Sequence, residues 1–165
     1  MIYGFNANEV FQMAVEIEDN GRRFYEKVQG IVDEPRVKDI FAMLAQAEIE
    51  HKARFSKLKS ELPAQTKETT VWDPDNETDQ YLKMMAGMHV FRVSDGVEKA
   101  LARVNTAEDA LLLAMAFEKD SIVFFLSMQE ATEEKQGHEL IGQLVHEEMG
   151  HLKKLSMELK KLRSS

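Results

Sequence analysis

Apolar residues recur every three or four positions along four long stretches of the chain, and this interval marks one face of an α-helix. The stretches predict helices at about residues 7–29, 35–62, 107–131 and 137–162. The polar positions between the apolar ones would face water. The pattern therefore predicts four long amphipathic helices that bury their apolar faces against one another.

Residues that favour helix starts border these stretches. Asn6 and Glu9 have the spacing of a capping box, and Thr106 is followed three positions later by Asp109. Pro35 stands where the first turn of a helix tolerates proline. The connection before Pro35 is short, so the first two helices are expected to be antiparallel neighbours.

Residues 63–105 have a different character. Positions 63–77 carry turn-forming residues and predict a loop, and shorter helical stretches follow around 81–85 and 97–104. This connection is too long for a tight turn and resembles the crossover of ferritin-like bundles. We therefore expect an all-α fold, in which residues 1–165 form a single ferritin-like four-helix bundle of two helical hairpins joined by a long crossover.

The two predicted hairpins are related by an internal duplication. Residues 11–62 align with residues 111–162 without a gap, although most positions differ. The matches fall on the predicted inner face. The matched positions include Ala14 and Ala114, Glu18 and Glu118, Phe24 and Phe124, Leu44 and Leu144, Glu48 and Glu148, and His51 and His151.

Composition narrows the classes of function. The 165 residues include no cysteine, which excludes disulfides, iron–sulfur clusters and thiolate catalysis. A net charge of −8 argues against a nucleic-acid surface, and no apolar run approaches the roughly 18 residues of a membrane span. The first residues lack the basic stretch and apolar core of a secretory signal. We expect a cytoplasmic protein with no nucleic-acid or membrane partner.

Two Glu-x-x-His motifs interrupt the apolar faces at core positions. They are Glu48 to His51 and Glu148 to His151, and the single glutamates Glu18 and Glu118 each lie 30 positions before a motif. Residues three apart on a helix share one face. Helix bundles use this set of residues to hold two iron or manganese ions. The predicted metal ligands are therefore Glu18, Glu48, His51, Glu118, Glu148 and His151.

Charge explains this number of ligands. Four buried carboxylates would repel one another, but two divalent cations would balance them, with two neutral imidazoles completing the site. By symmetry, Glu48 and Glu148 would bridge the metals, and Glu18 and Glu118 would be terminal ligands. Zinc would fit such a site but cannot change its redox state, so iron or manganese gives the site a purpose.

Other readings of these polar residues remain open. The six ligand candidates could instead lie at helix boundaries or pair with lysine and arginine outside the core. Tyr25 lies two turns after Glu18 and could face the site as a hydrogen-bond donor, or it could be core packing like its counterpart Phe125. His146 is expected to point away from the site, and Glu147 is expected to be a solvated neighbour of a ligand.

The residues around these positions resemble the rubrerythrin branch of the ferritin-like superfamily. The resemblance rests on residues 18–25, residues 118–125 and the two Glu-x-x-His motifs. It implies a non-haem di-iron centre that reduces hydrogen peroxide, or oxidises Fe(II) with peroxide or dioxygen, in defence against oxidative stress. A rubrerythrin-like peroxidase or ferroxidase is the activity that the resemblance implies.

The sequence departs from that family's pattern in two ways. Rubrerythrins carry a further glutamate where this chain has Ser121, and a Cys-ligated rubredoxin domain for which this sequence has no cysteine. The resemblance therefore implies a separate electron donor, such as a rubredoxin-like protein, and a homodimer is expected. An iron-handling ferritin-like protein, a non-catalytic metal-binding scaffold and an oxidase of an organic substrate remain alternatives.

Overall fold

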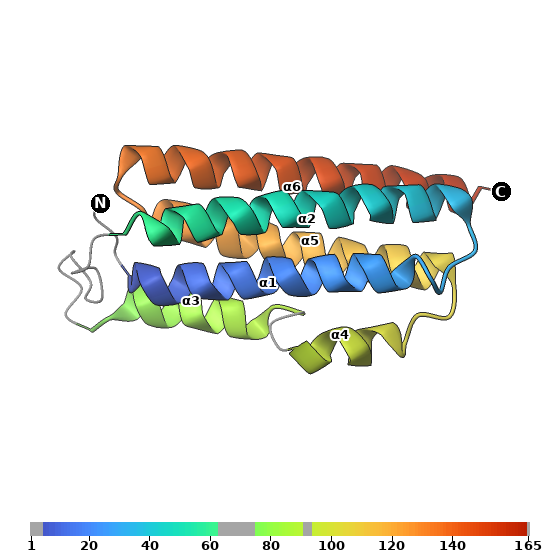
Figure 1. Ribbon diagram of the computed structural model, residues 1–165, viewed down its shortest axis with the longest axis horizontal. Coiled ribbons are helices and arrows are strands. Elements are labelled where there is room, and N and C mark those ends of the chain that lie inside the picture. The colour runs from blue at the N-terminus through green and yellow to red at the C-terminus, as the bar shows by residue number, and fades with distance from the viewer. Residues whose placement is uncertain (1–4, 63–74, 91–93, 165) are drawn as a thin grey trace.

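The computed structural model describes residues 5–62, 75–90 and 94–164. All regular structure in these residues is α-helical, as the sequence predicts. Four long helices lie side by side and two short helices lie outside them (Figure 1). The helices are α1 (Ala7–Val28), α2 (Pro35–Ser60), α3 (Glu77–Met88), α4 (Ser94–Leu101), α5 (Ala107–Glu130) and α6 (Lys135–Leu162).

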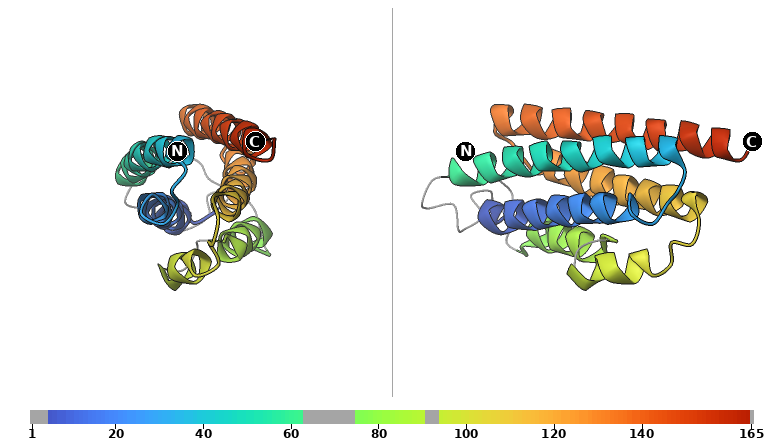
Figure 2. Two further views of the ribbon diagram at one scale, coloured as in Figure 1. Left: turned by 90° about the vertical axis from the view of Figure 1, so that its right-hand side faces the viewer. Right: turned by 45° about the vertical axis from the view of Figure 1, so that its right-hand side comes forward.

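The four long helices form two hairpins. Helix α1 packs along α2 and α5 packs along α6, while α2 and α6 meet across the bundle. Figure 2 shows the four helices end-on, around a shared interior. The all-α bundle of two joined hairpins that the sequence predicts is confirmed.

The crossover lies along one side of this bundle. Helix α3 packs on α5 and α1, and α4 packs on α1 (Figure 2). The hydroxyl groups of Tyr81 and Ser127 lie 3.1 Å apart between α3 and α5, and Arg23 of α1 pairs with Glu98 of α4 at 3.0 Å. Most of the loop predicted at residues 63–77 falls outside the described residues.

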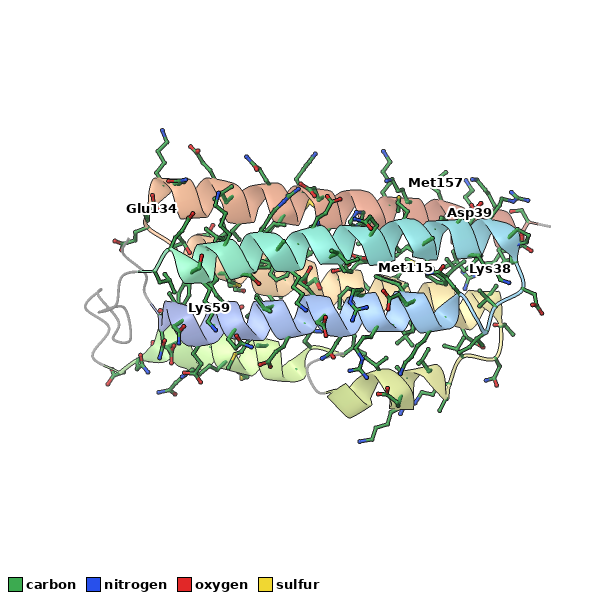
Figure 3. The ribbon with its side chains drawn as sticks, viewed as in Figure 1. Lys38, Asp39, Lys59, Met115, Glu134 and Met157 are labelled. Carbon is green, nitrogen blue, oxygen red and sulfur yellow. The ribbon has the colours of Figure 1, made fainter. Side chains whose placement is uncertain are left out.

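Side chains define where the helices begin. The Asn6 side chain accepts a hydrogen bond from the Glu9 amide at 3.2 Å, and Thr106 forms a full capping box with Asp109. Helix α6 begins at Lys135, two residues before the predicted start. The cause is Glu134, whose carboxylate accepts hydrogen bonds from the Gln136 and Gly137 amides. Figure 3 labels Glu134 at this end of the bundle.

The interior of the bundle is rich in aromatic side chains. A β-carbon added to Gly21 would lie 2.3 Å from the ring of Phe117, so glycine permits the close approach of α1 and α5 here. Across the described residues, no helix is both long and apolar enough to span a membrane. The long helices thus bring the inner faces of two related hairpins into contact.

Candidate metal centre

Six polar side chains meet inside the bundle, one from each of α1 and α5 and two from each of α2 and α6. Five of them have no exposed surface, and His151 is 8% exposed. Their ligand atoms form two overlapping groups, and within each group they lie within 4.8 Å of one another. The first group is Glu18, Glu48, His51 and Glu148, and the second is Glu48, Glu118, Glu148 and His151.

Helix geometry explains how these groups form. Glu48 and His51 are one turn apart on the buried face of α2, and the duplication repeats this pair as Glu148 and His151 on α6. The two imidazole rings stack with their centroids 5.7 Å apart. Glu48 and Glu148 belong to both groups, which is the position that a pair of bridging ligands would need.

The four buried carboxylates lie beside two histidines rather than beside lysine or arginine side chains of the described residues. Among the described residues, no lysine or arginine forms an ion pair with Glu18, Glu48, Glu118 or Glu148. Four of their buried oxygen atoms, on Glu18, Glu48 and Glu118, have no hydrogen-bond partner in the described structure. Such atoms cost free energy unless a partner satisfies them. The donor set therefore fits two divalent cations, because carboxylate oxygens and imidazole nitrogens are ligands that iron, manganese and zinc accept.

Burial and mutual repulsion shift the pKa values of these groups. Burial, followed by the charges of neighbouring glutamates, raises the pKa of Glu18 and Glu48 well above the usual range. The same two causes raise the pKa of Glu118 to about 8. Burial also favours the neutral form of Glu148, but hydrogen bonds from His151 and His51 outweigh it and lower its pKa. Without cations, the cluster therefore holds protons at neutral pH.

The histidines turn one nitrogen toward the carboxylates. Nδ1 of His51 lies 2.8 Å from Glu148, 3.2 Å from Glu18 and 4.0 Å from Glu48. Nδ1 of His151 lies 2.9 Å from Glu148. Burial opposes protonation of both rings, yet the nearby carboxylates raise the pKa to about 9 for His51 and about 10 for His151. A single proton on Nδ1 cannot serve three carboxylates, whereas a metal ion can bind all of them.

Tyr25 also faces the site. Its hydroxyl group is buried and donates a hydrogen bond to Oε1 of Glu118 at 2.6 Å. Burial and the charge of Glu118 raise the pKa of the phenol well above its usual value. Its counterpart Phe125 has no hydroxyl group and packs against Phe55, with ring centroids 4.8 Å apart. The duplicated hairpins therefore differ beside the site.

Glu147, expected to be a solvated neighbour of a ligand, also contacts two side chains of α2. It is partly exposed, but one of its oxygens lies 3.1 Å from Nε2 of His51 and the other accepts a hydrogen bond from Arg54 at 2.6 Å. The only hint of this contact in the sequence is that Glu147 directly precedes the predicted ligand Glu148. His146 is exposed, in agreement with the sequence.

Ser121, where rubrerythrins carry a glutamate, contacts a residue from the crossover. Its hydroxyl lies 3.0 Å from Nε2 of the buried His89, whose ring packs edge-on against Phe117. No periodicity in the sequence places His89 beside α5, because the contact depends on how the crossover returns. The sequence therefore does not predict the contact between His89 and Ser121.

The fold and the site define a class of helical bundle in which inward-facing glutamates and histidines can hold metal ions. The family model described as Rubrerythrin matches residues 9–159, and the chain belongs to this family of ferritin-like di-iron carboxylate proteins. The family resemblance seen in the sequence is thereby confirmed. Searches among curated proteins and among solved structures gave no match.

Proposed function

We propose that the protein is a di-iron oxidoreductase that reduces hydrogen peroxide, or oxidises Fe(II) with peroxide or dioxygen, in defence against oxidative stress. The observation that carries this proposal is the double ligand group, in which four buried carboxylates and two imidazoles converge and no lysine or arginine of the described residues pairs with them. Membership of a di-iron family supports a redox role for this site.

The ligand roles follow from the overlap of the two groups. Glu48 and Glu148 would contact both metals, and Glu18 and Glu118 would each complete one side. His51 and His151 would each bind one metal through Nδ1, the nitrogen that faces the carboxylates. When bound, two ferrous ions supply the two electrons that reduce the O–O bond of a peroxide. Manganese or zinc would also fit this set of ligands.

Tyr25 would hold a proton beside the metal site. The Tyr25 hydroxyl holds a proton 2.6 Å from a carboxylate oxygen of Glu118. The surrounding phenylalanine rings exclude water, so this hydrogen bond would orient Glu118 and give a path for proton delivery.

Anaerobic loading with Fe(II) tests the proposed function. The protein is mixed with two equivalents of Fe(II), hydrogen peroxide is added, and the absorption of ferric iron is followed. We expect oxidation to be faster than that of free Fe(II), and to fall to the free rate in Glu48→Ala. Glu50→Gln is the matched control, because Glu50 lies on the exposed side of α2 and should leave the rate unchanged.

Metal analysis and sizing chromatography of the same protein distinguish the proposed function from the alternatives. Less than one metal per chain would favour a scaffold that retains only the fold. Oxidation together with assembly into a hollow shell in sizing chromatography would favour an iron-handling protein. A homodimer that oxidises Fe(II) at an unchanged rate in Glu48→Ala would contradict the proposed site.

The electrons for repeated turnover would come from outside the site. We propose a separate donor such as a rubredoxin-like protein, or Fe(II) itself, because the sequence contains no cysteine for an iron–sulfur centre. The proposed oligomer is a homodimer. Steady peroxide reduction with a reduced rubredoxin, and none without it, would distinguish a protein donor from Fe(II).

A further inference from the structure

His51 is held from both sides. Its Nδ1 faces the carboxylates of the site, and its Nε2 lies 3.1 Å from Glu147 on α6. If Nδ1 binds a metal, Nε2 carries the ring proton and donates a hydrogen bond to Glu147. Arg54, one turn after His51 on α2, fixes the other Glu147 oxygen at 2.6 Å. Arg54 and Glu147 thus form an outer clamp on this imidazole.

The second imidazole has no such clamp. The position equivalent to Glu147 in the first hairpin is Ala47, which has no side-chain acceptor. Within the described part of the chain, no carboxylate contacts Nε2 of His151, and this ring keeps some exposure to solvent. Lys154, the equivalent of Arg54, contacts the sulfur of Met43 instead, at 3.2 Å. The ligand set is symmetric, but its support is not.

We propose that Glu147 is a positioning residue that makes His51 the stronger imidazole ligand, so that the two metal positions differ in affinity. The tight position is the one at Glu18 and His51, and the weaker one is at Glu118 and His151. This inference rests on the proposed function, because it requires both positions to bind metal.

The physical reason is the bond that the second ring nitrogen makes. A carboxylate that accepts the Nε2 proton fixes the tautomer and orientation of the ring and makes Nδ1 more basic. Loss of such a partner typically weakens metal binding by about 10–100-fold. Exchange of metal with solvent would therefore take place mainly at the His151 position, whose ring is the more accessible of the two.

An anaerobic titration with Co(II) tests this inference without any turnover. Calorimetry reports the two affinities, and the visible absorption of Co(II) reports the ligand geometry of each bound ion. We expect two binding steps in the wild type, separated by about 10–100-fold. Glu147→Gln should weaken the tighter step by about tenfold or more and change the spectrum of the first ion, with two ions still bound.

Ala47→Glu supplies the converse test. It places a carboxylate in the position equivalent to Glu147 and should strengthen the weaker step by about tenfold or more, so that the separation between the two steps narrows. Glu50→Gln removes the same charge from the exposed side of α2 and should change neither step, which controls for long-range electrostatics. The fold of each variant is checked by its circular dichroism.

The failures can be told apart. Two equal affinities in the wild type, or unchanged steps in Glu147→Gln, would overturn the role of Glu147 and leave the two-metal site intact. Failure of Ala47→Glu to strengthen the weaker step would also count against it. Binding of fewer than two ions by the wild type would overturn the proposed function itself.

Discussion

The two hairpins of this bundle carry the same ligands in different surroundings. The hairpin of α1 and α2 supplies Glu18, Glu48 and His51, and the hairpin of α5 and α6 repeats them 100 positions later. Yet Tyr25 donates to Glu118 from the first hairpin, whereas Phe125 offers nothing in return to Glu18. The difference teaches that the duplication preserves the residues that face the site and leaves their supporting contacts to vary.

The largest expected effect comes from removing a ligand that both groups share. Glu48→Ala and Glu148→Ala should each reduce metal content from two ions per chain to less than one, because either loss opens both groups. Glu18→Ala and Glu118→Ala should each cost about one ion. Metal analysis after dialysis measures this. Equal losses in all four variants would contradict the assignment of bridging and terminal roles.

The next largest effect is expected from removing the Tyr25 hydroxyl, which has no counterpart at Phe125. Tyr25→Phe removes the donor to a buried Glu118 oxygen and should lower the free energy of unfolding of the metal-free protein by about 1–3 kcal/mol. Urea denaturation measures the change. Tyr81→Phe is the matched control, because it removes a tyrosine hydroxyl whose hydrogen bond to Ser127 is exposed. An equal loss in both tyrosine variants would show that burial of the bond is unimportant.

Glycines of the two hairpins should respond oppositely to alanine. Gly21→Ala pushes a methyl group into the ring of Phe117, and overpacking of this kind costs about 1–3 kcal/mol, of which helix propensity returns up to about 1 kcal/mol. Gly150→Ala meets no atom within 4 Å and should stabilise the protein by up to about 1 kcal/mol. Thermal melts of both variants check the signs, and a stabilised Gly21→Ala would contradict the close packing of α1 and α5.

The smallest effect concerns how the hairpins begin. The Asn6 amide donates to Asp79 of α3 at 2.9 Å, whereas the Thr106 amide donates to Asp109 of its own helix. Burial opposes ionisation of Asp79, but hydrogen bonds from Lys83 and Asn6 lower its pKa. Its stabilisation is therefore present above the unfolded pKa, near 4, and is lost as the pH falls through the lower folded pKa.

Asp79→Asn checks this effect of pH. The variant should be less stable than the wild type at pH 7, and the difference should shrink as the pH falls below about 4. Asp75→Asn is a suitable control for the charge change, because Asp75 is exposed. A stability difference that stays constant from pH 7 to pH 2 would show that the partners of Asp79 do not stabilise its ionised form.

Periodicity in the sequence is enough to predict the four long helices and the inward direction of the six ligand candidates. Those residues lie on the buried stripe of each helix, so the fold brings them together once the helices pack. The contacts of Glu147 and His89 lie beyond that reasoning. Glu147 reaches His51 from the edge of the stripe, through the length of its side chain, and His89 depends on the path of the crossover.

A crystal of the wild-type protein grown with Fe(II) under anaerobic conditions tests the central claim most directly. Anomalous scattering at the iron edge should give two peaks inside the bundle, each next to both Glu48 and Glu148 and to one of the two histidines. A bundle interior without anomalous peaks, or iron bound only at surface carboxylates, would contradict the claim that these six side chains form a metal centre.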